Sequence, residues 1–277
     1  MGLRINTNIA SISAQRALGI TKMNLDNNLR KMSSGERITR ASDDAAGLAI
    51  SEKLKAHIRG IRQAKRNADD GISLIQTAEG ALNEVSNIVI RLRELSIQAA
   101  SDTVCDVERG FSNIEFQNLL EEIQRISKGT EFNGRKLLDG TGGLVEVQVG
   151  IHNDPTQDRI KFDSSETDAT LEAIGLMGEA CNTKEGAQLS LHKLDDALTK
   201  INGNRANLGA LQNRLQSAGN TIAITEENFS AANSRIRDVD VASETADMAK
   251  NNILSQAGVS VLAQANQSPN FALKLLA

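Results

Sequence analysis

The stretch LDDALTKINGNRANLGALQNRLQSAGNTIAITEENFSAANSRI (residues 194–236) repeats an apolar residue at every seventh position without a break. The repeating positions are Leu194, Ile201, Leu208, Leu215, Ile222, Phe229 and Ile236. A second set follows three residues after most of these, at Leu211, Ala218, Thr225, Ala232 and Val239. Heptads sustained over this length form an apolar seam along one helix face. The stretch therefore predicts a long helix in coiled-coil-like packing.

The N-terminal half carries the same kind of repeat. Its seven-spaced positions are Leu54, Ile61, Ala68, Ile75, Leu82 and Val89. A shorter third helix is predicted over residues 107–128, with an inward face made of Phe111, Ile114, Leu119, Ile123 and Ile126. Alternation with period two in LVEVQVG and DRIKFD predicts a β-hairpin at about residues 140–165. The fold class is therefore mostly α, a long antiparallel helical bundle with one small β-hairpin element.

Composition excludes several classes of function. The chain has 277 residues with no Trp, no Tyr and only six Phe, which favours helices packed lengthwise on aliphatic residues. Its net charge is −4 with both signs interspersed, so no basic surface for nucleic acid is expected. No stretch predicts membrane insertion, and the first residues lack the apolar run of a cleaved signal peptide.

No catalytic, cofactor-binding or metal-binding residues are predicted. The two cysteines and three histidines are scattered along the chain, at Cys105, Cys181, His57, His152 and His192. They match no metal or redox spacing, so each is interpreted as a surface or packing residue. A Cys105–Cys181 disulfide remains an open alternative in an oxidising setting. Asp43 and Asp44 precede a helix and are interpreted as its cap.

Both ends of the chain lack charge where a solvated helix normally carries it. Residues 251–273 contain no Asp, Glu, Lys or Arg, although Asn, Gln and Ser interrupt their apolar stripe. An isolated helix of this kind is marginal in water, and burying it between subunits leaves no unpaired charge. Pro269 predicts that the last helix loosens or ends near that residue. The residues expected to drive inner-core assembly are Ile5, Ile9, Ile12, Leu254, Ala257, Gly258, Val261 and Phe271.

Four blocks in order give the chain a resemblance to bacterial flagellins over nearly its full length. They are SSGERITRASDDAAGLAISEKL (33–54), RLREL with Gln98 (91–98), EFNGRKLLDG (131–140), and the C-terminal stretch from residue 236 to 276. The resemblance implies a filament subunit in minimal form: terminal helices 1–40 plus 241–277, a rod over 41–240, and no outer domain. The alternative is a hook–filament junction protein, which shares the terminal helices.

The resemblance also implies partners. They are further copies of the chain, the flagellar export apparatus, a C-terminal export chaperone, and the filament cap and hook-associated proteins. The protein is then secreted into the extracellular filament of the bacterial flagellum. A Toll-like innate receptor is a further implied partner, through a surface that maps to Arg91, Glu94, Leu95, Gln98 and Glu115. Ile90 departs from the family pattern here, and contact between protofilaments is the alternative role of this surface.

Overall fold

The computed structural model describes residues 7–276, with side chains for residues 7–267. Six helices dominate it: α1 (Ile9–Ser34), α2 (Ala45–Ala99), α3 (Asp106–Gly129), α4 (Leu171–Ile174), α5 (Lys184–Arg237) and α6 (Val241–Leu276). The strands are β1 (Glu131–Phe132), β2 (Arg135–Lys136), β3 (Leu144–Gln148) and β4 (Arg159–Asp163). The chain divides into two compact units, the described part of Met1–Ala56 with Asn228–Ala277 as the first and His57–Glu227 as the second.

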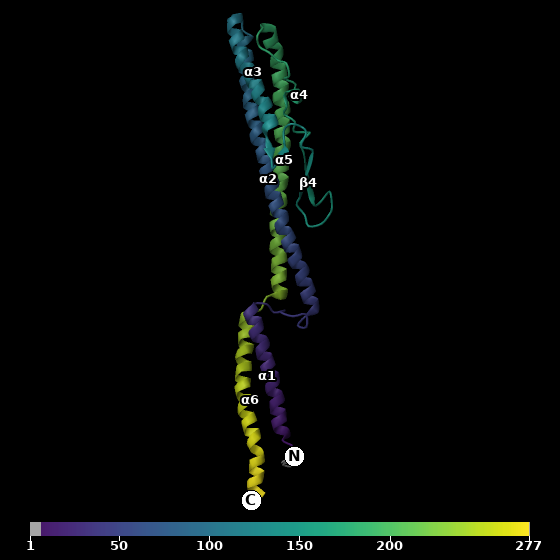
Figure 1. The fold of residues 1–277 in the computed structure, drawn as a ribbon, viewed down its shortest axis with the longest axis vertical. Coiled ribbons are helices and arrows are strands. Elements are labelled where there is room, and N and C mark those ends of the chain that lie inside the picture. The colour runs from purple at the N-terminus through teal and green to yellow at the C-terminus, as the bar shows by residue number, and fades with distance from the viewer. Residues whose placement is uncertain (1–6, 277) are drawn as a thin grey trace. The chain divides into compact units, whose positions relative to one another are not determined.

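The first unit contains α1 and α6, which lie side by side and run antiparallel (Figure 1). Asn8 begins α1, because its side chain accepts a hydrogen bond from the Ser11 N–H at 3.1 Å. Gly35 ends it in the left-handed conformation, with φ of 71°, and its N–H donates to Lys31 O. Helix α6 continues to Leu276, so of the two expectations for Pro269, that the helix loosens or that it ends there, an end is wrong.

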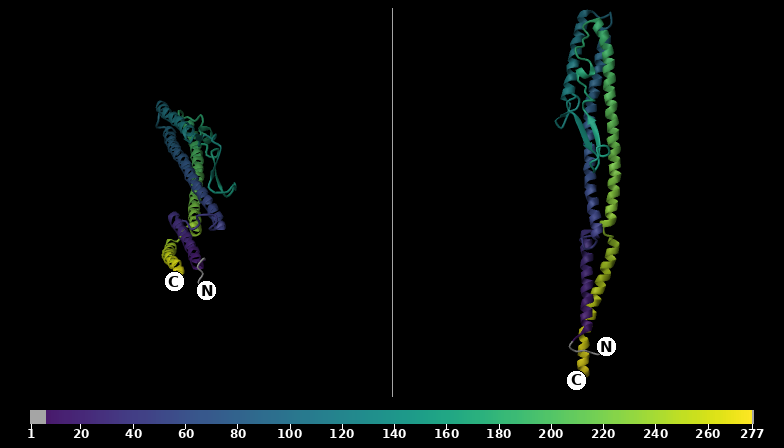
Figure 2. Two further views of the ribbon diagram at one scale, coloured as in Figure 1. Left: turned by 60° about the horizontal axis from the view of Figure 1, so that its bottom comes forward. Right: turned by 90° about the vertical axis from the view of Figure 1, so that its right-hand side faces the viewer.

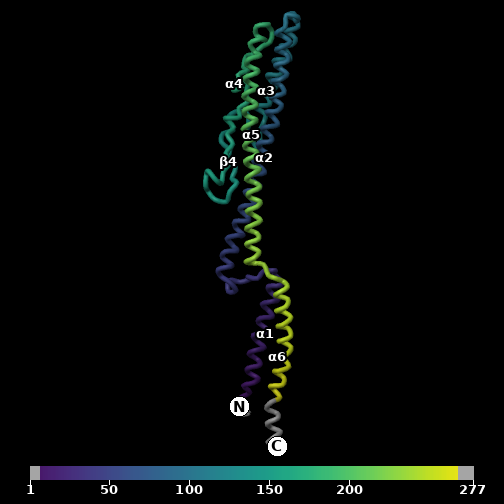
Figure 3. Tube along the Cα trace, turned by 180° about the vertical axis from the view of Figure 1, so that it is seen from behind, coloured from purple at the N-terminus to yellow at the C-terminus, as the bar shows by residue number. Residues whose placement is uncertain are grey.

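Two short connections are tied together within this unit. Figure 3 traces the link from α5 to α6 beside the turn that leaves α1. Arg37 N donates to Arg237 O at 2.6 Å, and Val239 N donates to Gly35 O at 3.0 Å. Arg237 also forms ion pairs with Glu36, at 2.9 Å, and with Glu52. These contacts join the turn after α1, the start of α2 and the end of α5 within the first unit.

The second unit is built on α2, α3 and α5 (Figure 2). Its core contains fully buried residues from each of the three helices, among them Leu92, Phe116 and Leu194. Cys181 is buried and Cys105 is exposed, and both thiols are free, so the disulfide alternative is excluded here. The seven-spaced positions that are buried in this unit are Ile61, Ala68, Ile75, Leu82, Val89, Leu194, Ile201, Leu208, Leu215 and Ile222. Leu54, Phe229 and Ile236 are half-buried and belong to the first unit.

The inward face of α3 differs from the sequence prediction. Phe111 is 67% exposed and Ile114 is 60% exposed, whereas Phe116 and Ile123 are fully buried. Helix α3 carries apolar residues on two opposite faces, and periodicity alone cannot say which face the bundle covers. The face with Phe116 is inside, and the prediction for Phe111 and Ile114 is wrong.

Two antiparallel hairpins connect α3 to α4. The first, β1–β2, turns at Asn133 and Gly134, whose φ angles of 50° and 78° suit a two-residue turn. In the second hairpin, β3–β4, Val145 lies opposite Phe162 and Val147 lies opposite Ile160. It packs against α2, where a β-carbon at Gly71 would lie 3.1 Å from Val147. A side chain at this glycine would push the hairpin away from the helix.

Candidate assembly surfaces

The α1–α6 pair is joined by polar contacts in its seam. Asn8 Nδ2 donates to Ala265 O at 2.7 Å, and Ser11 Oγ donates to Asn266 Oδ1 at 2.7 Å. At the other end, Lys31 Nζ lies 3.5 Å from Glu244 Oε1. The α6 residues that are half-buried along this seam recur every three or four positions: Glu244, Met248, Asn251, Ser255, Gly258, Leu262 and Ala265. The seam is thus mostly small or polar.

Many of the large apolar side chains of this pair lie outside the seam. The two buried residues of α1 are Ser11 and Asn28. By contrast, ten large apolar side chains of the two helices are about half exposed or more: Ile9, Ile12, Ile20, Met23, Leu29, Val241, Ile253, Leu254, Val259 and Val261. A monomeric helix pair normally buries its aliphatic residues and exposes its polar ones. This pair instead leaves much of its aliphatic surface exposed, while the two buried side chains of α1 are polar.

The residues expected to drive assembly fall into three groups. Ile9, Ile12, Leu254, Ala257 and Val261 are exposed on the outer faces of α1 and α6. Gly258 instead lies in the seam, where its added β-carbon would be 3.2 Å from Leu18 Cδ1. Ile5 lies outside the described residues, and so does the side chain of Phe271.

The second predicted surface is centred on Arg91 of α2. Arg91 Nε donates to Glu115 Oε1 at 2.9 Å, and Arg91 Nη1 donates to Glu94 Oε2 at 2.9 Å. Hydrogen bonding to Glu94 first, and then to Glu115, raises the pKa of Arg91. Gln98 is exposed next to this cluster. Leu95, however, is only 3% exposed and belongs to the core, because it shares the inward face of α2, so its assignment to the surface is wrong.

An exposed apolar face lies on the same two helices. On α3 it comprises Val107, Phe111 and Ile114, at 67%, 67% and 60% exposure. Ile90 and Ile97 of α2 are 46% and 50% exposed. Exposed apolar groups of this size are common at protein interfaces when they gather on one face. These exposed residues were not expected, because the apolar spacing of α3 predicted Phe111 and Ile114 in the core.

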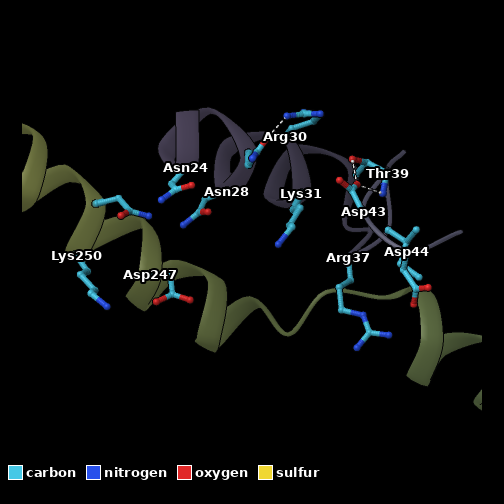
Figure 4. Close-up of a pocket in the computed structure, with 13 residues that line it drawn as sticks. Asn24, Asn28, Arg30, Lys31, Arg37, Thr39, Asp43, Asp44, Asp247 and Lys250 are labelled. Atoms are coloured by element: carbon cyan, nitrogen blue, oxygen red, sulfur yellow. Dashed lines mark hydrogen bonds between the residues drawn. The ribbon is translucent and has the colours of Figure 1, made fainter. Parts of the chain in front are cut away.

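A polar recess of about 660 Å³ opens between α1, the turn that follows it, and α6. Asn28 and Lys31 extend from α1 towards α6, where Asp247 and Lys250 lie (Figure 4). Asp43 also lines the recess, and hydrogen bonds from the backbone of Arg40 and from Thr39 lower its pKa. Charges of both signs alternate around the recess, so it favours no single small charged ligand.

Comparison with known proteins identifies the family of this chain. Residues 5–142 match the family described as "Bacterial flagellin N-terminal helical region", and residues 191–276 match "Bacterial flagellin C-terminal helical region". The chain is 45% identical over 272 residues to a protein named flagellin from Halalkalibacterium halodurans, covering 98% of this chain and 99% of that one. The chain belongs to the bacterial flagellin family.

Two further comparisons describe this flagellin. It is 41% identical over 284 residues to the "Flagellar filament 30.7 kDa core protein" of Treponema maltophilum, covering 98% of this chain and 99% of the relative. The crystal structure of Bacillus cereus flagellin superposes with a TM-score of 0.51 at 31% identity, covering 61% of this chain and 94% of that one. These names favour a filament protein over a hook–filament junction protein.

The flagellin lacks an evident outer domain. Between the two matched family regions, residues 143–190 are all described and hold only β3, β4, α4, their connections and the first turns of α5. Among the helices in the described part of the chain, none combines the length and apolar character needed to cross a membrane.

Proposed function

We propose that this flagellin is the filament subunit of a bacterial flagellum, and that neighbouring copies cover the outer faces of its α1–α6 pair. One observation carries the proposal: α1 buries Ser11 and Asn28 while Ile9 and Ile12 stay more than half exposed. Covering the exposed half of one aliphatic side chain is worth about 1 kcal/mol. The ten such side chains together offset a cost of association of ~4–15 kcal/mol.

The lack of charge in residues 251–273 supports the same proposal. A charged side chain buried without a partner costs several kcal/mol, at roughly 3–5 when one member of a pair is removed. Asn, Gln, Ser, Ala and Gly carry no such cost when neighbouring copies satisfy their hydrogen bonds. A helix with these residues is suited to a crowded protein interior and gains little in water.

A second contact between copies is proposed on α2 and α3. Val107, Phe111 and Ile114 supply apolar area, and the Arg91, Glu94 and Glu115 cluster supplies a polar rim. This composition, an apolar centre with charges at its edge, is typical of protein interfaces. We assign Arg91, Glu94, Gln98 and Glu115 primarily to contacts between protofilaments. Recognition by a Toll-like receptor is a secondary role of the same surface when monomers are shed.

The remaining partners follow from membership of the family. We propose secretion through the flagellar export apparatus, an export chaperone that covers the C-terminal helix, and the cap and hook-associated proteins as assembly partners. The uncharged stretch of α6, with Ile253, Leu254 and Val259 exposed, supports the need for a chaperone before assembly.

Truncation tests the proposed function. A chain lacking residues 254–277 is expected to remain soluble, with the thermal unfolding of the α2–α3–α5 core unchanged, but to add no length to filament seeds in electron micrographs. The full chain, treated in parallel by lowering and restoring pH, should elongate the seeds. Normal elongation by the truncated chain would contradict the role assigned to α6.

A further inference from the structure

Two of the three histidines of the chain meet in the second unit. The rings of His57, on α2, and His152, in the connection between β3 and β4, have centres 6.1 Å apart and planes at 68°. The two residues are far apart in sequence, and their spacing predicts no such contact. The third histidine, His192, is exposed on α5.

The β3 strand and the residues after it hold His152 in this place. Two glycines of α2 leave room for this segment. A β-carbon added at Gly71 would lie 3.1 Å from Val147, and one added at Gly60 would lie 3.2 Å from Ile151. Between them, Asn67 Nδ2 donates to Gln148 O at 3.1 Å. Ile151 faces Gly60, and the next residue of the connection, His152, faces His57, which lies one helical turn before Gly60. The strand thus tracks α2 backwards and brings the two imidazoles together.

The connection that carries His152 is itself ordered by internal hydrogen bonds. Gln148 Nε2 donates to His152 O at 2.8 Å and to Gly150 O at 3.0 Å. The carboxylate of Asp154 accepts from Thr156, and that of Asp158 accepts from Asp154 N at 3.0 Å. These carboxylates close the turn, while Ile151 and His152 are the side chains of this connection that lie against α2.

We propose that His57 and His152 form a binding site for a divalent transition metal that prefers imidazole, such as Zn²⁺, and that the metal clamps the end of the hairpin onto α2. Imidazole nitrogens are ordinary ligands of Zn²⁺, Ni²⁺ and Cu²⁺. A metal ~2.1 Å from one nitrogen of each ring places the ring centres roughly 5–6 Å apart, close to the separation seen.

Water completes the coordination of this site. The described residues hold no group of three or more His, Cys, Asp or Glu that could bind a metal, so the protein supplies two ligands. His152 is exposed and His57 is half-buried, so an ion reaches the rings without opening the fold. Because its two ligands come from segments far apart in sequence, the metal acts as a cross-link. It binds the folded state and not the unfolded chain, and it therefore stabilises the fold.

Edge-to-face packing of two aromatic rings is the competing explanation for this contact. Substitution by phenylalanine distinguishes ring packing from metal binding. Phenylalanine keeps a ring at either position but cannot bind a metal. His57→Phe and His152→Phe therefore preserve the packing and remove one ligand each. His192→Phe is the matched control, because His192 lies far from this site. Asp195, on the next turn of α5, pairs with Arg93 of α2, and Arg93 is about 50 Å along α2 from His57.

The experiment is a calorimetric titration of the full chain with Zn²⁺ at neutral pH, using Cys105→Ser throughout because an exposed thiol also binds zinc. One Zn²⁺ per chain is expected for the unchanged chain and for His192→Phe. Binding should weaken at least about tenfold in His57→Phe and in His152→Phe, since even removal of a supporting residue costs this much. Zn²⁺ should raise the melting temperature only where it binds.

Two results would overturn the proposal. One is the absence of Zn²⁺ binding to the unchanged chain, which leaves ring packing only. The other is unweakened binding by His152→Phe, which places any zinc elsewhere. If His57→Phe does not fold, His152→Gln gives the same reading from an exposed position outside the helices.

Discussion

Leu18 of α1 lies directly against Gly258 of α6, so that a β-carbon at position 258 would be 3.2 Å from Leu18 Cδ1. The contact lets two helices with few apolar seam residues approach closely. Their polar contacts, such as that between Ser11 and Asn266 at 2.7 Å, depend on the same approach. A small residue at position 258 is therefore a requirement of the pair within one chain, separate from any contact between chains.

Gly258→Val should loosen the α1–α6 pair. The branched side chain displaces Leu18, at a cost of about 1–3 kcal/mol for overpacking. Hydrogen–deuterium exchange of α1 and α6 peptides in the monomer should accelerate by about tenfold. Gly19→Val is the matched control on α1, because nothing lies within 4 Å of its β-carbon position. Equal exchange in the two variants would remove the seam assignment of Gly258.

Phe111→Ala should impair polymerisation while sparing the fold. Its side chain is 67% exposed, so the melting temperature should barely change, but burial between copies would be worth ~1.5–3 kcal/mol. The critical concentration for seeded growth should then rise roughly ten- to a hundredfold. Phe116→Ala is the control within the same helix. It is fully buried, and its loss should lower the free energy of unfolding by about 3–5 kcal/mol.

Two glycines of α2 should respond to alanine in opposite ways. Gly80 has nothing within 4 Å of its β-carbon position, so Gly80→Ala should raise the free energy of unfolding by about 0.5–1 kcal/mol through helix propensity. At Gly71 the same change meets Val147 at 3.1 Å and Leu215 at 3.3 Å, and overpacking of ~1–3 kcal/mol outweighs that gain. Denaturant unfolding of each variant measures whether its free energy of unfolding rises or falls. A gain at Gly71 equal to that at Gly80 would contradict the docking of the hairpin.

Acid should destabilise the β3–β4 hairpin. Hydrogen bonds from Lys161, and then from Arg159, lower the pKa of Glu146, and hydrogen bonds from Ser165 lower that of Asp163. A carboxyl whose pKa is lower in the folded state stabilises the fold above its unfolded pKa, and that contribution is lost as pH falls through the folded value. The melting temperature should thus be flat down to about pH 5 and fall below about pH 4.

Substitution separates this hairpin contribution from general acid effects. Asp163→Asn with Glu146→Gln should reduce the loss of melting temperature between pH 5 and pH 3, because two of the titrating groups are gone. Asp196→Asn, at an exposed position on α5, should leave the pH profile unchanged. An identical profile in all three chains would show that the hairpin carboxylates contribute nothing to the pH dependence.

The long helices could be predicted from the sequence because their apolar residues repeat with one unambiguous period. Leu194 and Val89 are fully buried where the heptads place them. Helix α3 could not be oriented in this way, since Phe111 and Phe116 give it apolar residues on opposite faces. Burial by the other two helices decides between them, and that information lies outside the helix itself.

The α1–α6 seam escaped prediction for a different reason. Ser11 and Asn28 are buried because they face the partner helix, yet small polar residues leave no apolar period in a sequence. The contact between His57 and His152 depends on the register of a hairpin against α2, which no local pattern encodes. The β1–β2 turn, by contrast, is encoded locally, because Asn133 and Gly134 form an Asn-Gly pair that favours a two-residue hairpin turn.

The central claim is that neighbouring copies cover the outer face of the α1–α6 pair, and seeded growth of Leu254→Glu tests it most directly. Leu254 is 47% exposed in the single chain, so a glutamate there should leave the monomer's melting temperature unchanged. Burial of its charge between copies should abolish elongation of seeds in electron micrographs, whereas Leu254→Met should elongate them normally. Normal elongation by Leu254→Glu would contradict the claim.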